Sequence, residues 1–66
     1  MDDPAKDRYE LQEFIDAGAT AGFVTTRTCG NDQYETLIER RIDMLEKRGR
    51  VYRLYRLQGD LKEVLR

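Results

Sequence analysis

Hydrophobic residues recur every three or four positions in the middle of the chain, which is the spacing of one face of a helix. These apolar positions are Tyr34, Leu37, Ile38, Ile42 and Leu45. Asp32, with Glu35 three residues later, has the spacing of an N-terminal capping box, and Gly49 suits the left-handed conformation that ends a helix. The pattern predicts a helix from about Gln33 to Arg48.

A second helix is predicted near the N-terminus, from about Pro4 to Ala17. Asp3 followed by Pro4 is typical of a helix start, because aspartate accepts a hydrogen bond from a free backbone N–H and proline needs no donor there. Gly18 offers a left-handed exit. The apolar residues between these signals share one helical face: Leu11, Phe14 and Ile15.

Between the two helices, Phe23–Cys29 is rich in β-branched and aromatic residues and ends at the turn residues Gly30 and Asn31. This composition predicts a strand. The small residues of Gly18–Gly22 lack the lysine and the hydroxyl of a phosphate-binding P-loop. We therefore expect that segment to be a plain connector.

The basic stretch 50–57 fits two structures. As a helix it would gather Val51, Leu54 and Tyr55 on one side and its arginines on the other. As a strand it would give Phe23–Cys29 a hydrogen-bonding partner, and the flanking Gly49 and Gly59 limit it to a short segment. We favour the strand, with the helix as the alternative. Asp60 with Glu63 then has capping-box spacing and predicts a short final helix.

These elements give an α+β fold in one compact domain, residues 1–66, with the order α-β-α-β-α. Two strands separated by a helix can pair in parallel through a right-handed crossover. Because two strands alone are marginally stable, we expect the sheet to be extended by dimerisation.

Composition limits the chemistry. Hydrophobic residues make up 39% of the chain and charged residues 38%, and no apolar run is long enough for a membrane span, so we expect a cytoplasmic protein that does not bind membranes. Histidine and serine are absent, which removes the usual general base and the commonest hydroxyl nucleophile. We expect no enzymatic activity, no cofactor, no metal site and no small-molecule substrate. Cys29, the single cysteine, is expected to be a reduced, buried or half-buried thiol.

Charge is unevenly distributed along the chain. Residues 1–16 hold six acidic and two basic side chains, a net charge of −4, whereas residues 40–56 hold seven basic and two acidic ones, a net charge of +5. The total of −1 therefore hides a bipolar chain. The two halves are expected to attract each other, within the fold or between subunits.

The first functional interpretation is a small non-enzymatic protein-interaction module, an adaptor, regulator or inhibitor of a larger protein, whose partner is another protein or a second copy of the chain. Tyrosine and arginine are enriched at the energetic centres of interfaces. The predicted partner-binding residues are Arg48, Arg50, Tyr52, Arg53, Tyr55 and Arg56. If 50–57 is a strand, Arg53 and Arg56 point to opposite faces, which argues against a single phosphate-binding row.

The second interpretation is nucleic-acid binding by the basic region 40–56. The segment "IERRIDMLEKRGRVYRLYR", Ile38–Arg56, resembles the end of the recognition helix and the first wing strand of winged-helix regulators. That resemblance implies a DNA-binding transcriptional regulator whose central helix enters a groove. The sequence pI of about 5.3 favours the protein-interaction hypothesis.

Overall fold

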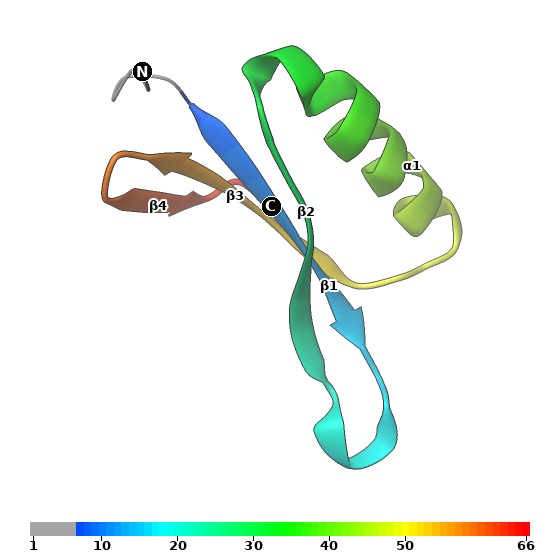
Figure 1. The fold of residues 1–66 in the computed structure, drawn as a ribbon. Helices are drawn as coiled ribbons and strands as arrows, with labels where there is room; N and C mark the ends of the chain where they lie inside the picture. The colour runs from blue at the N-terminus through cyan, green and yellow to red at the C-terminus, as the bar shows by residue number, and fades with distance from the viewer. Residues whose placement is uncertain (1–6) are drawn as a thin grey trace.

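The computed structural model describes residues 7–66, in which four antiparallel strands form one sheet and a helical segment lies over one of its faces (Figure 1). Strands β1 (Arg8–Ile15) and β2 (Gly22–Gly30) precede the helical segment, and β3 (Tyr52–Gln58) and β4 (Leu61–Val64) follow it. The strand order across the sheet is β2-β1-β3-β4. The α+β class is confirmed, but the described residues run β-β-α-β-β.

The predicted N-terminal helix is wrong over Arg8–Ile15, which form strand β1. Tyr9, Leu11, Glu13 and Ile15 alternate onto the helix-covered side, as every second residue of a strand must. Glu13 breaks the apolar alternation in the sequence, although its side chain is buried. The predicted start of that helix, at residues 3–4, lies outside the described residues.

Strand β1 also corrects the predicted strand pairing. The segments 23–29 and 50–57 were expected to pair with each other, with a parallel arrangement as one possibility, but β1 lies between β2 and β3 and pairs with both in antiparallel fashion. A single chain therefore supplies four strands. This removes the two-stranded sheet that was our reason to expect extension by dimerisation.

The strand predicted at Phe23–Cys29 is confirmed and extends by one residue at each end. It contains a bulge, because Leu11 pairs with Arg27 while the next residue, Gln12, pairs with Thr25. The segment expected to be a plain connector joins β1 to β2 and contains a 3₁₀ turn, η1 (Gly18–Thr20), that the sequence did not predict. Gly18 has φ +71°, so the left-handed exit exists but ends a strand instead of a helix.

The central helix is confirmed. A 3₁₀ turn, η2 (Asn31–Gln33), leads into a π-helical stretch, η3 (Tyr34–Glu39), and then into helix α1 (Arg40–Lys47). The capping box predicted from its acidic residues is absent, because no side chain caps the starts of these elements. Gly49 has φ +66° and takes the predicted left-handed conformation just beyond the helix.

The strand interpretation of the basic stretch is confirmed by β3, and the final helix predicted from Asp60 and Glu63 is wrong. Gln58 pairs with Leu61, so Gly59 and Asp60 form a two-residue hairpin loop between β3 and β4. Gly59 has φ +58°, the conformation that favours glycine at the first position of such a loop. The same glycine that limits β3 therefore starts a hairpin.

The core lies between the sheet and the helical segment. Three residues come from the strands and three from the helical face predicted from the sequence: Leu11, Cys29, Leu54, Ile38, Ile42 and Leu45. Apart from the 3₁₀ turn η1, residues 7–66 contain only this one helical segment, whereas winged-helix domains normally place two helices before the recognition helix. Likewise, none of these residues forms a helix long and apolar enough to cross a membrane.

Candidate interaction surface

Only one face of the sheet is covered by the helical segment (Figure 1). Because side chains alternate along each strand, the residues on the other side follow from the strand pairing. We call this side the open face. Its residues are Arg8, Glu10, Gln12, Phe14, Phe23, Thr25, Thr28, Arg53, Tyr55, Leu57, Lys62 and Val64.

Aromatic and aliphatic side chains from all four strands lie on the open face. Phe14 of β1 and Phe23 of β2 pair directly across the strands, with ring centroids 5.5 Å apart and an edge-to-face angle of 69°. Tyr55 and Leu57 of β3 are half-buried among their neighbours, and Val64 of β4 is 64% exposed. The open face therefore presents a discontinuous apolar surface that no described helix covers.

Cations lie over two of these aromatic rings. The Arg53 guanidinium carbon is 4.0 Å from the centroid of the Phe23 ring, and Lys62 Nζ is 4.5 Å from the centroid of the Tyr55 ring. Both distances are within the range of cation–π attraction. Arg53 and Lys62 are thus held against the sheet.

A carboxylate network occupies the middle of the open face. Gln12 Nε2 donates to Glu10 Oε2 over 2.6 Å, and Thr25 Oγ1 donates to the same oxygen over 2.7 Å. Lys62 Nζ lies 3.5 Å from Glu10 Oε1. The hydrogen bonds from Gln12 and Thr25, more than the charge of Lys62, hold the pKa of Glu10 below its ordinary value.

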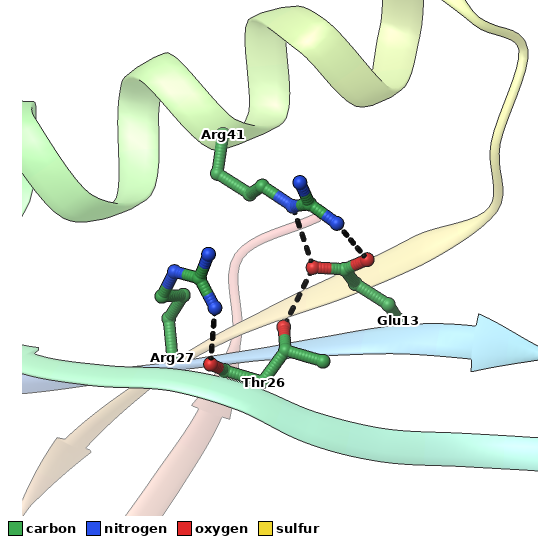
Figure 2. A network of polar contacts seen from close by, with 4 residues as sticks. All are labelled: Glu13, Thr26, Arg27 and Arg41. Carbon is green, nitrogen blue, oxygen red and sulfur yellow. Dashed lines mark hydrogen bonds and ion pairs between the residues drawn. The ribbon is translucent and has the colours of Figure 1, made fainter.

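The helix-covered side has its own carboxylate, and Figure 2 shows it between α1 and the sheet. Arg41 donates from Nε to Glu13 Oε2 and from Nη2 to Oε1, each over 2.8 Å, and Thr26 Oγ1 donates to Oε2 over 2.7 Å. Glu13 is 3% exposed. These bonds, above all those from Arg41, lower the pKa of Glu13. Because Arg41 belongs to α1 and Glu13 to β1, the ion pair joins the helix to the sheet.

The Glu13–Arg41 pair joins the acidic and basic halves of the chain within the fold, as the charge distribution predicted. Two further basic residues of region 40–56 form ion pairs: Lys47 with Asp43, over 3.1 Å, and Arg56 with Glu63. Three of the seven basic side chains in that region are therefore already engaged by carboxylates.

The six predicted partner-binding residues occupy three places. Arg48 and Arg50 are exposed in the connection between α1 and β3. Tyr52 and Arg56 lie on the helix side of the sheet, whereas Arg53 and Tyr55 lie on the open face; each of these four belongs to β3. The predicted separation of Arg53 from Arg56 is confirmed.

The side chain of Tyr52 contacts the helix and the core. Its hydroxyl donates to Glu46 Oε2 over 2.5 Å, and its ring packs on the core. Burial, followed by this hydrogen bond, raises the pKa of Tyr52. The side chain therefore stabilises the packing of the helix, and Tyr52 is not part of the open face.

Sequence reasoning missed Phe14, Phe23 and Lys62, which complete the surface around Arg53 and Tyr55. Phe14 was assigned to a helix, and the cross-strand position of Phe23 requires the register of β1 with β2. The available signal was the alternation within residues 8–15. Cys29 is buried, as expected, and burial raises the pKa of its thiol.

Comparison with known proteins gives no further information: no family model matches the sequence, and neither a curated protein nor a solved structure matches the chain at a significant level.

Proposed function

We propose that this protein is a small non-enzymatic interaction module that binds another protein through the open face. The observation that carries the proposal is the set of aromatic and aliphatic side chains, including Phe14, Tyr55 and Leu57, on a sheet face that no helix within residues 7–66 covers. Aromatic and arginine side chains are enriched at interfaces, where such surfaces lose contact with water. Arg53 provides the arginine on the same face.

A different protein suits this face better than a second copy of the chain. The open face carries three cations, Arg8, Arg53 and Lys62, against the single carboxylate of Glu10. Two such faces packed together would bring like charges into contact, which is unfavourable in a dry interface. We therefore infer a partner of opposite charge.

Self-association through the exposed edge strand β4 meets a similar obstacle. Edge-to-edge antiparallel pairing of two identical strands uses a two-fold axis perpendicular to the sheet, so only residues of the same face lie opposite each other. In the registers centred on β4, either Lys62 faces its own copy or Glu63 does. Like charges directly opposite each other destabilise strand pairing.

Nucleic-acid binding is the competing function. A protein that binds a nucleic-acid duplex places several unpaired arginine and lysine side chains along the phosphates. In region 40–56, Arg41 and Arg56 are engaged by carboxylates, while Arg53 and Arg48 lie at separate places. This dispersion favours a protein partner over the groove-binding mode that the basic sequence suggested.

The test compares two partly exposed apolar residues, one on the open face and one away from it. Leu57→Asn should reduce capture of the partner from an extract of the producing cells by at least about tenfold, because it removes apolar contact area from the interface. Leu61→Asn changes a residue that is 71% exposed and pairs with Gln58, which places it on the helix side of the sheet, and it should leave capture unchanged. Quantitative mass spectrometry of the captured proteins gives the readout.

Both variants must first give wild-type-like two-dimensional NMR spectra, so that a loss of capture reflects the surface and not unfolding. Equal capture by Leu57→Asn and wild type would reject the open face as the binding surface. Capture of nucleic acid alone, removed by nuclease treatment, would favour the competing function.

A further inference from the structure

Arg53 is positioned on the open face by contacts on both sides of β1. Its own strand, β3, pairs with β1 so that Arg53 lies opposite Gln12. Its guanidinium reaches across to β2 and lies over the ring of Phe23, which is itself fixed by the edge-to-face contact with Phe14. The planar group is therefore oriented before any partner binds.

The hydrogen-bonding capacity of this guanidinium is unused within the described part of the chain. Among residues 7–66, Arg53 takes part in none of the side-chain hydrogen bonds or ion pairs, in contrast to Arg41 and Arg56. The one carboxylate of the open face, Glu10, accepts instead from Gln12 and lies near Lys62. An exposed arginine that is stacked on a ring and has no acceptor among residues 7–66 can present its N–H donors to a ligand.

We infer, on the basis of the proposed function, that Arg53 on Phe23 is the anchor for a carboxylate of an acidic segment in the partner protein. Arginine suits this role because its planar fork makes two parallel hydrogen bonds to one carboxylate. Arg8 and Lys62 add positive charge on the same face, so a segment with several acidic residues is complementary to it. The chain as a whole carries a net charge of −1, so this excess of cations is a local property of the surface and not a consequence of the overall charge.

An acidic protein segment fits these observations better than single-stranded nucleic acid. Nucleic-acid strands bind to sheets by stacking bases on aromatic rings. Here Phe23 and Tyr55 each already carry a cation over the ring, supplied by Arg53 and Lys62. A carboxylate can bind to Arg53 without displacing it from Phe23, whereas a base stacking on that ring would have to displace the guanidinium.

The experiment is an NMR titration of the isotopically labelled chain with two probes of matched charge, an oligoglutamate peptide and a single-stranded oligothymidylate. We expect oligoglutamate to shift the resonances of Arg53, its guanidinium N–H, and the neighbouring Phe23 and Lys62. The shifts should decrease at high salt, since the contact is exposed and electrostatic. Oligothymidylate should bind more weakly.

Matched variants separate a specific anchor from general attraction. Arg53→Gln and Arg56→Gln each remove one positive charge from β3, but from opposite faces. Arg53→Gln should weaken oligoglutamate binding by about tenfold, and Arg56→Gln should leave it within about twofold of wild type. Arg53→Lys keeps the charge but loses the fork, so its affinity should fall between those of wild type and Arg53→Gln.

Three results would overturn the inference: equal weakening by Arg53→Gln and Arg56→Gln, tighter binding of oligothymidylate than of oligoglutamate, or no shift with either probe. The first would leave only general electrostatic attraction, and the second would change the partner class to nucleic acid. Each of these results is independent of the Leu57→Asn capture test, so the acidic partner could be rejected while the open face is retained.

Discussion

The helix-covered face and the open face are built from alternate residues of the same strands, but they differ in how far their charged groups are paired within the fold. On the covered face, the carboxylate of Glu13 receives two hydrogen bonds from Arg41 and one from Thr26, so the buried charge is fully paired. On the open face, Glu10 is also satisfied, but Arg53 has no acceptor within the described residues.

This difference follows from the cost of burial. A charge that is removed from water must be paired and hydrogen-bonded, whereas an exposed guanidinium keeps its water until a ligand replaces it. The covered face therefore uses its polar groups for folding. The open face keeps Arg53 without an acceptor among the described residues and leaves apolar side chains partly exposed, which is the basis for the proposed binding surface.

The largest expected effect comes from truncating leucines on the two sides of β3. Leu54 is 1% exposed in the core, so Leu54→Ala should lower the free energy of unfolding by about 2–5 kcal/mol. Leu57 lies half-buried on the open face, and Leu57→Ala should cost less than about 1 kcal/mol. Chemical denaturation monitored by circular dichroism measures both. Equal losses would mean that the open face is part of the core.

The next effect compares the two carboxylates of β1. Glu13→Gln removes the charge from the fork with Arg41 and should lower the free energy of unfolding by about 1.5–3 kcal/mol. Glu10→Gln acts on a network at the surface and should cost less than about 1 kcal/mol. The same denaturation assay applies. A larger loss for Glu10→Gln would reverse the proposed division between the faces.

The buried ion pair also explains why β1 could not be predicted from the sequence. The inward positions of β1 are Tyr9, Leu11, Glu13 and Ile15. A strand is recognised in a sequence by apolar residues at every second position, which are the inward ones. Glu13 counts as polar in the sequence because its partner, Arg41, is 28 residues away. Because Glu13 was not recognised as an inward position, the helical spacing of Leu11, Phe14 and Ile15 led to the incorrect prediction of a helix.

Local signals were sufficient elsewhere. The central helix combined five apolar positions at helical spacing with a glycine exit, and the second strand combined β-branched residues with turn residues at its end. Local signals also misled: Asp60 and Glu63 have capping-box spacing, but Asp60 follows Gly59 in a hairpin loop and Glu63 pairs with Arg56. The hairpin was favoured by tertiary pairing that sequence spacing does not contain.

The candidate site was predictable only in part for the same reason. Arg53 and Tyr55 were found because both lie in one strand, and alternation alone separates Arg53 from Arg56. Phe23 lies 30 positions away from Arg53, and its place beneath the guanidinium depends on β1 lying between their strands. Strand order, which the sequence did not predict, was needed to find the anchor.

The smallest effect concerns pH. A hydrogen bond from Arg41 is the main cause of the lowered pKa of Glu13, and a hydrogen bond from Gln12 is the main cause of the lowered pKa of Glu10. In the unfolded chain, a glutamate side chain has a pKa of about 4.3. As the pH falls through that value, the unfolded state takes up protons before the folded state does. This stabilisation is therefore complete above about pH 4.3 and is lost as the pH falls towards the folded pKa values. Denaturation at a series of pH values should give a flatter decline for Glu13→Gln than for Glu10→Gln, because Glu13 accepts two hydrogen bonds from the Arg41 guanidinium, which outweigh the opposing effect of burial on its pKa. Equal declines would mean that the two faces contribute alike to acid sensitivity.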